Sequence, residues 1–224
     1  MPTRHVELQF CDDRARRAFA AAGIDSLADL CAGERGETVT RAATRRCARL
    51  ELDDDVYFVK TQDVQVWRLP PQRWPSYLLR GSPLRRERHA LATLSGAGFA
   101  TPTVVAAGAS RPGALRVRAA LVTRAVPGHV DLARWSGTPA ADDDGAARAT
   151  FDAAEALVAR AHGLGLVLGG AKYRNFLVPV QGCADPAAIV VLDQPSLRRS
   201  GARRLRERDV ALLAFDRHRY GRGR

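Results

Sequence analysis

The sequence lacks the features that define several large classes of protein. It has four cysteines, none in a C-x-x-C pair, which disfavours a zinc site and fits a reducing compartment. No apolar run reaches the roughly 18 residues of a membrane-spanning helix, and Met1–Glu7 has no signal-peptide core. These absences predict a cytoplasmic protein, either free or bound peripherally to a membrane surface.

Aromatic residues are scarce as well, at 6% of the chain, and no internal repeat is visible. Few aromatic side chains leave few platforms for stacking bases, and no helix carries its basic residues as one stripe, so specific nucleic-acid binding is disfavoured. The formal net charge is nevertheless +11. This balance favours acidic partners such as nucleotides, phosphorylated glycolipids or an anionic membrane surface. A genome that uses arginine freely would produce the same balance.

The length of 224 residues allows one domain or two small lobes with a sizeable core. Residues 1–32 predict an N-terminal helical extension with two short helices, over 13–22 and 27–32. Residues 33–124 are expected to form a first lobe built on an antiparallel sheet. Its first strands are expected at Glu37–Arg41, Cys47–Leu52 and Val56–Lys60. The segment 61–82, with its prolines and tryptophans, is expected to be irregular.

Two charged residues of this lobe lie on apolar faces. Lys60 ends a strand face that is otherwise apolar, where a lysine needs an anionic partner. A helix capped by Ser82 and ended by Gly96 places Glu87 on its buried stripe. The apolar members of that stripe are Leu84, Leu91 and Leu94. A buried carboxylate is costly unless paired, so we predict a Lys60–Glu87 ion pair. The alternatives are a lysine that reaches solvent at the strand end and a solvated Glu87 at the edge of the stripe.

The first lobe is expected to end with strands over 101–108 and 115–123, after which Pro127 and Gly128 interrupt the chain. The rest of the chain predicts a reduced, mainly helical lobe. The segment Arg124–Gly128 therefore predicts a hinge, with the second lobe over residues 125–224. The next helix follows a polar, Asp-rich linker and ends at His162. Its apolar stripe is Ala147, Phe151, Ala154, Val158 and Ala161.

A last helix is expected over residues 202–215. Its inner face carries Asp209 between Leu205 and Leu212, a second carboxylate on an apolar stripe. The basic tail 217–224 is expected to fray.

The most informative stretch lies between these two helices, at residues 162–175. Lys172 and Asn175 are three residues apart, an apolar hairpin is expected over 176–192, and Asp193 closes its second strand. This stretch resembles the catalytic loop of protein-kinase-like enzymes, in which a His-x-Asp is followed two residues later by Lys and three further by Asn. On that pattern the loop His falls on Leu168 and the catalytic Asp on Gly170.

The resemblance to protein-kinase-like enzymes can be narrowed to one family. Several segments are similar to the lipopolysaccharide core kinases, which phosphorylate Kdo or heptose sugars. The segments are Gly36–Arg41, Arg45–Lys60, Glu87–Leu91, Gly98–Gly108 and Leu205–Leu213. The resemblance implies an α+β, protein-kinase-like fold, with a small antiparallel β lobe that carries one key helix and a reduced helical lobe.

The resemblance also implies roles for the singled-out residues. Lys60, held by Glu87, would grip the phosphates of ATP, and Lys172 would be the catalytic lysine. Asn175 and Asp193 would bind the nucleotide through Mg²⁺ and face each other as the metal-binding pair. Asp209 would hold the backbone of the loop. The acceptor would be an anionic sugar or glycolipid at the inner membrane surface.

Three departures separate the sequence from an ordinary kinase. The base position is Gly170, and the strand turn over the phosphates has no glycine, although Arg41, Arg45 and Arg46 could donate to phosphate instead. A solvated basic turn is the alternative for these arginines. Gln194-Pro195 follows Asp193 in place of Phe-Gly, and the activation segment is very short, so a peptide substrate is not expected. His162 is expected to be a helix-end or core residue and not a base.

Loss of the base predicts impaired phosphotransfer, because general-base catalysis contributes about 10²–10⁴-fold while positioning and charge neutralisation supply most of the rest. The first hypothesis is therefore an ATP- and Mg²⁺-dependent sugar kinase of reduced activity. The alternative is a pseudokinase that serves as a nucleotide-binding or scaffold module and regulates a partner. A basic nucleic-acid-binding protein is the third.

Overall fold

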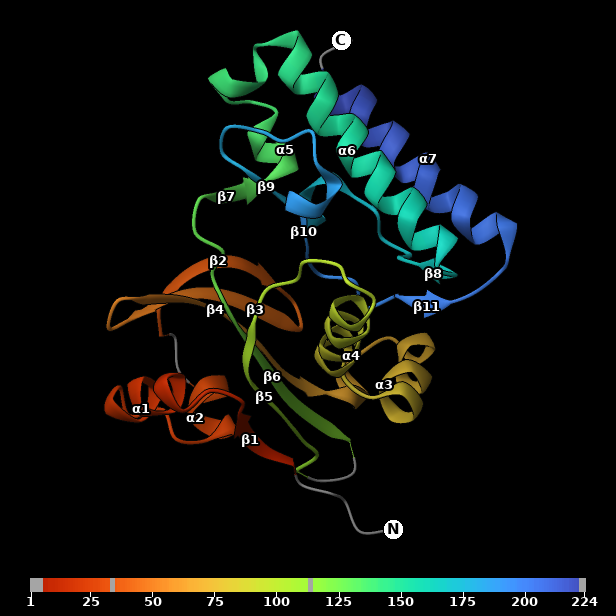
Figure 1. Ribbon diagram of the computed structural model, residues 1–224. Helices are drawn as coiled ribbons and strands as arrows, with labels where there is room; N and C mark the ends of the chain where they lie inside the picture. The colour runs from red at the N-terminus through yellow and green to blue at the C-terminus, as the bar shows by residue number, and fades with distance from the viewer. Residues whose placement is uncertain (1–5, 33–34, 113–114, 222–224) are drawn as a thin grey trace. The chain divides into compact units, whose positions relative to one another are not determined.

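The structure is a computed structural model that describes residues 6–32, 35–112 and 115–221 (Figure 1). The chain divides into two compact units. The first holds Met1–Arg88 and Thr103–Ala125, and the second holds His89–Pro102 and Val126–Arg224. The predicted fold class, α+β with an antiparallel sheet in the first part of the chain, is confirmed.

The first unit is built on a six-stranded antiparallel sheet in the order β1-β5-β6-β4-β3-β2. The strands are β1 (Val6–Phe10), β2 (Glu37–Ala42), β3 (Arg45–Leu52), β4 (Asp55–Gln65), β5 (Val104–Ser110) and β6 (Arg116–Arg124). A tight turn joins β3 to β4, and its Asp53 has a φ of 53°. Aspartate tolerates this left-handed conformation better than most residues. The predicted turn is therefore present.

The first two helices belong to the core of this sheet. Residues of α1 (Asp13–Ala21) and α2 (Leu27–Ala32) share a buried apolar cluster with β4, β5 and β6. Asp12 caps α1 by accepting from the backbone N–H groups of Arg14 and Ala15, at 2.8 and 3.2 Å. Its second carboxylate oxygen accepts from Arg124 at 2.6 Å. A cap and an ion pair thus tie the first helix to strand β6.

The prediction that residues 61–82 are irregular is wrong in part. Strand β4 continues to Gln65, and a helix, α3, spans Trp74–Arg80. The strand continues because Asp63 is paired: it accepts from Arg116 and Arg118 on the neighbouring β6, at 2.6–3.0 Å. A proline in the first turn of α3 removes an N–H that would have no helical partner there, so it does not break the helix. Strand β1 was not predicted either.

Helix α4 (Pro83–Gly96) begins as predicted. The Ser82 hydroxyl accepts from the backbone N–H of Leu84 at 3.1 Å. The predicted apolar stripe is buried, and so is Glu87 on it. No helix in the described parts of the chain has the length and apolar character to cross a bilayer.

The second unit packs three helices around short strands. The helices are α5 (Leu132–Trp135), α6 (Asp144–Gly163) and α7 (Arg203–Tyr220). Strands β7 (His129–Asp131), β9 (Phe176–Pro179) and β10 (Val190–Val191) form one antiparallel sheet, and β8 (Leu166–Val167) pairs with β11 (Arg198–Arg199). The predicted stripe of α6 is buried throughout. Helices α6 and α7 lie side by side (Figure 1).

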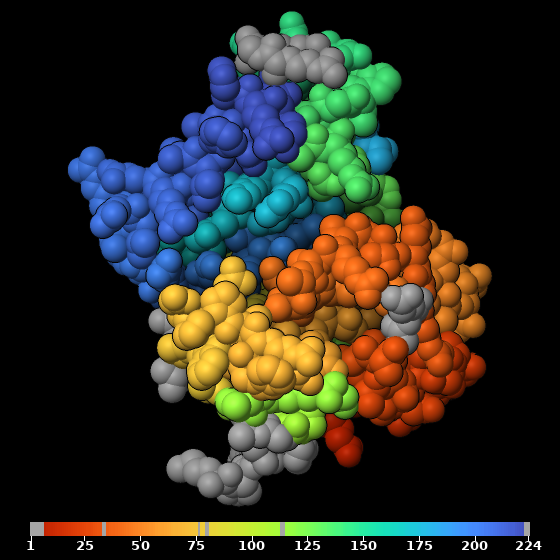
Figure 2. All heavy atoms as spheres, turned by 180° about the vertical axis from the view of Figure 1, so that it is seen from behind, coloured from red at the N-terminus to blue at the C-terminus, as the bar shows by residue number. Residues whose placement is uncertain are grey.

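The prediction that the tail 217–224 frays is wrong for residues 217–220, because α7 continues to Tyr220, and residues 222–224 lie outside the described part of the chain. Arg217 holds this last turn: its Nη1 donates to Asp152 and Glu155 on α6, at 2.8 and 2.7 Å. The guanidinium also lies over the ring of Phe151. The outer side of α7 stays exposed, as the dark-blue surface in Figure 2 shows.

Candidate functional site

The predicted ion pair between Lys60 and Glu87 is confirmed in the first unit. Lys60 Nζ lies 2.5 Å from Glu87 Oε1. Strand β4 presents the lysine and the buried face of α4 presents the glutamate, whose side chain is 3% exposed against 24% for the lysine. A carboxylate this deeply buried is stable only with a charged partner. The pair therefore fixes the position of the lysine ammonium group.

The hairpin of β2 and β3 carries the three arginines that the sequence offered as phosphate donors, and Arg46 has partners within the protein. Arg46 donates to the Thr38 hydroxyl at 3.0 Å and to the carbonyls of Arg35 and Gly36 at 3.0 and 3.2 Å. Arg41 and Arg45 are exposed on the same hairpin. If the hairpin meets phosphate, the exposure of Arg45 suits it as a donor, whereas Arg46 already has three acceptors.

Asp209 organises the loop of the second unit. Its side chain is fully buried, and its two oxygens accept from the backbone N–H groups of Leu168 and Gly169, each at 2.8 Å. His162 Nε2 lies 3.2 Å from Asp209 Oδ2. His162 is therefore a buried residue near the end of α6, directed at a structural carboxylate.

The two glycines of the loop have different constraints. Gly169 has a φ of 72°, and a Cβ there would lie 2.8 Å from Ser196 Cβ, so the position requires glycine. Gly170 lies outside the left-handed region. A Cβ at Gly170 would lie 3.4 Å from Gln194 Oε1 and 3.8 Å from Asn175 Nδ2, which is ordinary van der Waals contact. Nothing in the backbone of position 170 therefore excludes an aspartate.

Gln194 is a candidate that sequence reasoning missed. Its side chain is fully buried, and within the described residues neither amide atom has a hydrogen-bond partner. An unsatisfied buried amide is costly, and a native protein that keeps one usually has a reason. The amide lies beside the base position at Gly170. The available signal was a polar residue directly after Asp193, in place of an aromatic one.

Asn175 and Asp193 are neighbours, which suits a metal-binding pair. Asn175 Nδ2 donates to the Gly170 carbonyl at 2.8 Å and approaches the Asp193 carbonyl at 3.5 Å. Asp193 has a φ of 44°, a strained conformation that is concentrated at functional sites. The amide nitrogen of Asn175 is engaged, so its oxygen and an oxygen of the Asp193 carboxylate are the groups whose chemistry suits a cation. Mg²⁺ prefers oxygen ligands and takes one or two carboxylates together with substrate phosphates, so these residues fit it.

The described residues contain no group of three or more His, Cys, Asp and Glu side chains that could hold a metal by itself. A Mg²⁺ ion at Asn175 and Asp193 would therefore need the oxygens of a nucleotide or water to complete its coordination.

Lysine usage is a second signal that the sequence offers. Of the 35 basic Lys and Arg residues, only Lys60 and Lys172 are lysines. Arginine and lysine are not interchangeable where a compact point charge is needed. In a chain that uses arginine almost everywhere, both lysines are residues to which the family resemblance assigns a role. Lys172 lies at the start of η4 (Tyr173–Asn175) and is partly exposed.

Together, an antiparallel sheet carrying a Lys–Glu pair, a loop held by a helix aspartate and an adjacent Asn and Asp define a protein-kinase-like protein. The model of the lipopolysaccharide kinase (Kdo/WaaP) family matches residues 31–221. The chain therefore belongs to that family. Its structure is similar to that of WaaP in complex with acyl carrier protein, with a TM-score of 0.68 and 25% identity over 93% of this chain and 80% of that one. A comparison with curated proteins gives no match.

Proposed function

We propose that this protein binds Mg²⁺-ATP and transfers the terminal phosphoryl group to a hydroxyl of a lipopolysaccharide core sugar or related glycolipid, at a rate limited by the absence of a base. The observation that carries the proposal is the pairing of Lys60 with Glu87. A buried glutamate that holds a strand lysine positions a cation for phosphate, which phosphoryl transfer requires.

The remaining roles are those that the family resemblance implies, and the geometry of the second unit supports them. Asn175 and Asp193 would hold Mg²⁺, which neutralises charge on the nucleotide phosphates. Lys172 would supply a further positive charge to the transferred group. Asp209 keeps the loop backbone in place through the N–H groups of Leu168 and Gly169. Phosphoryl transfer depends mostly on such positioning and charge, so the chain retains most of what the reaction needs.

A second function, that of a nucleotide-binding pseudokinase, is favoured by one observation. The side-chain atoms nearest to the Cβ position of Gly170 belong to the amides of Gln194 and Asn175. Neither amide accepts a proton at neutral pH, and general-base catalysis contributes about 10²–10⁴-fold. A chain that binds ATP without turnover would regulate a partner through its nucleotide state.

Calorimetric titration with Mg²⁺-ATP, accompanied by an ATP-hydrolysis assay, tests the proposal. We expect the natural chain to bind and to turn over slowly. Lys60→Ala and the isosteric Asp193→Asn should weaken binding, with thermal melting to verify folding. Arg204→Gln, at an exposed arginine of α7, is the matched control and should bind normally. Binding without turnover supports the pseudokinase, and no binding by the natural chain removes both functions.

A further inference from the structure

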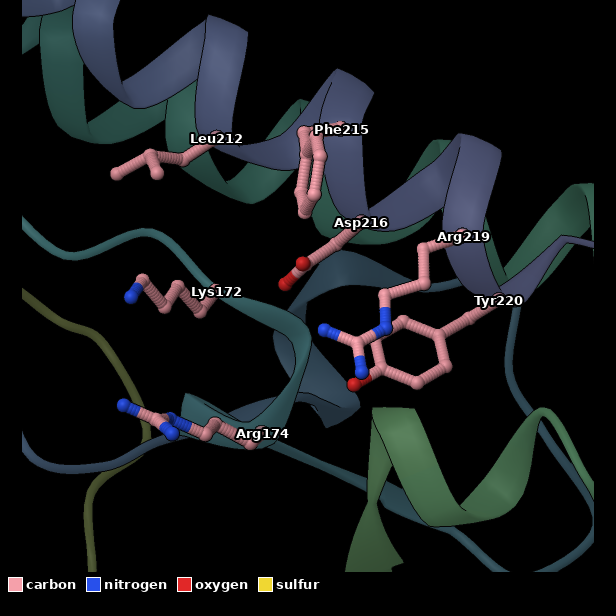
Figure 3. A pocket seen from close by; sticks show the side chains of 7 residues that line it. All are labelled: Lys172, Arg174, Leu212, Phe215, Asp216, Arg219 and Tyr220. Carbon is pink, nitrogen blue, oxygen red and sulfur yellow. The ribbon is translucent and has the colours of Figure 1, made fainter.

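A pocket of about 160 Å³ opens between the loop and α7, within the second unit (Figure 3). The loop contributes Lys172 and Arg174, and α7 contributes Leu212, Phe215 and Arg219. Pockets for drug-sized ligands are larger, at roughly 300–1,000 Å³. The volume therefore suits one charged group and part of a ring, not a whole nucleotide.

Three cations line this pocket against a single carboxylate. Within the described parts of the chain, Lys172, Arg174 and Arg219 form no ion pair. Figure 3 shows the side chains of Lys172 and Arg174 extending the same way from the loop, away from Arg219, whose guanidinium comes down from α7 beside the ring of Tyr220. The carboxylate is Asp216, which is largely buried and accepts from the backbone N–H of Tyr173 at 2.8 Å. Cations that surround one cavity repel each other, and an anion relieves that repulsion.

The rest of the lining is apolar. The side chains of Leu212 and Phe215 and the ring of Tyr220 form the α7 wall. Phe215 is unusually exposed for a large apolar residue, at 62%. A pocket with basic side chains on one side and apolar side chains on the other fits an anionic group attached to a ring or a short carbon skeleton.

A backbone hydrogen bond joins Lys172, which lines the pocket, to Gly170. The backbone N–H of Lys172 donates to the Gly170 carbonyl at 2.8 Å, and the Tyr173 N–H donates to Asp216. A group bound at Arg174 is thus held by the same loop as Gly170, where the resemblance expects the base beside the reacting hydroxyl. Asn175, by contrast, directs its amide at Gly170 and Asp193.

We propose that this pocket is an anion-binding subsite for the acceptor, in which Arg174 and Arg219 bind a phosphate or carboxylate substituent and Lys172, at the edge of the pocket, remains for the transferred group. The identification of the ligand as the acceptor rests on the proposed function, but the presence of an anion site does not. The ligand could be a free sugar or a lipid headgroup, and each would present the same chemical group, a monoanionic or dianionic oxyacid. Arginine is suited to such groups because its fork can donate two parallel hydrogen bonds.

The direct test uses glucose 6-phosphate and inorganic phosphate as probes, titrated without nucleotide at constant ionic strength, with uncharged glucose as the control ligand. We expect both phosphates to bind and glucose not to bind. Arg174→Gln and Arg219→Gln should each weaken binding about tenfold, the effect of losing one charge-assisted hydrogen bond. Arg204→Gln removes the same charge from another exposed position of α7 and should leave the affinity unchanged.

A second arm identifies the source of the anion. Vesicles of zwitterionic lipid with and without a phosphomonoester lipid are tested for co-sedimentation with the natural chain and with Arg174→Gln/Arg219→Gln. Vesicle binding that needs the phosphomonoester and both arginines assigns the pocket to a lipid headgroup. Binding of glucose 6-phosphate alone assigns it to a free sugar.

Three results would overturn the assignment. The natural chain fails to bind every phosphate probe, or Arg204→Gln weakens binding as much as the pocket variants, or the pocket variants lose Mg²⁺-ATP affinity in parallel. The last result would make the pocket part of the nucleotide site. A chain that binds the probes but not Mg²⁺-ATP would keep the anion site and lose the kinase function, so the two failures are distinguishable.

Discussion

The Lys60–Glu87 pair of the first unit and the Gly170 loop of the second unit differ in how complete their expected side chains are. In the first unit the charged pair is complete, with its atoms 2.5 Å apart. In the second unit the loop keeps its supporting contacts but has no side chain at the base position. The difference follows from what each residue does for the fold. Removing either member of the pair leaves a buried charge without its partner, whereas no contact in the loop depends on a side chain at position 170.

The same distinction holds inside the second unit. Asp209 satisfies two backbone N–H groups, and Asn175 satisfies the Gly170 carbonyl. Loss of Asp209 would leave two backbone N–H groups unpaired, at about 1–3 kcal/mol for each group. Without Asn175, the Gly170 carbonyl would still accept from the Lys172 N–H. Asp209 therefore has a structural role in the loop, whereas nothing in the loop depends on a side chain at position 170.

The largest expected effect comes from restoring the base. Gly170→Asp should raise ATP turnover at saturating Mg²⁺-ATP by up to about 10²–10⁴-fold, if the base is the only defect. The backbone at position 170 accepts a side chain, so folding should be preserved. Gly170→Asn has the same shape and cannot take the proton, so it is the matched control. Equal turnover in the two variants would contradict a base role.

Breaking the pair of the first unit should mainly affect stability. Glu87→Ala leaves the Lys60 ammonium group partly buried and unpaired by Glu87, and should lower the free energy of unfolding by about 3 kcal/mol. Urea denaturation measures the change. Glu87→Gln keeps the shape and should cost less, because an amide oxygen still accepts from Lys60. A loss below about 0.5 kcal/mol, the range of ordinary surface substitutions, would mean that the pair has no structural role.

The two loop glycines provide a sharper comparison. Gly169→Ala places a Cβ 2.8 Å from Ser196 Cβ on a backbone with φ of 72°, and should cost about 1–3 kcal/mol of unfolding free energy. Gly170→Ala meets only ordinary contacts and should stay within about 0.5 kcal/mol of the natural chain. Both variants are measured by the same urea titration. Equal losses would show that position 170 is as constrained as position 169.

The smallest expected effect is a pH dependence that arises in the first unit. The backbone hydrogen bond from Ala15 holds the pKa of Asp12 below its usual value, and the hydrogen bond from Arg116 does the same for the pKa of Asp63. A carboxyl with a lowered pKa stabilises the folded chain above its unfolded pKa, and this contribution is lost as the pH falls through the lower, folded value. Stability should therefore decline below about pH 4, near the usual carboxyl pKa.

This pH dependence is tested by urea denaturation of the natural chain and of Asp12→Asn/Asp63→Asn, at pH 6 and pH 3. Each exposed or half-exposed ion pair contributes about 0–1 kcal/mol, so the natural chain should lose slightly more stability on acidification than the variant. An identical loss in both would assign the acid sensitivity to other carboxyls.

Much of the local structure was predictable because its causes are local. The stripe of α4, the stripe of α6 and the capping Ser82 follow from residue spacing along one helix. The placement of Glu87 and Asp209 on buried faces follows from the same periodicity, and so does the expectation that each needs a partner. The two predicted strands that became β2 and β3 also have the expected positions.

Other elements were not predictable because their causes are distant in the chain. Strand β1 exists through its pairing with β5, about a hundred residues later, and the end of β4 is held by arginines of β6. The last turn of α7 is held by acids of α6. In each case the local residues are polar or lack a clear period, and a partner far along the sequence supplies the hydrogen bonds that define the element.

The same distinction between local and distant causes applies to the candidate site. The sequence by itself predicted which residues would carry phosphoryl transfer, because the Lys, Glu, Asn and Asp stand in the order that kinase-like enzymes use, and the same resemblance assigns the base position to Gly170. Only the tertiary structure decided that Gln194 lies against that glycine, that Asp209 accepts from the loop, and that Arg219 of α7 joins Lys172 and Arg174 at one pocket. The physical reason is that residue order along the chain carries chemical type, whereas the distances between side chains from separate elements are set by how the helices and strands pack.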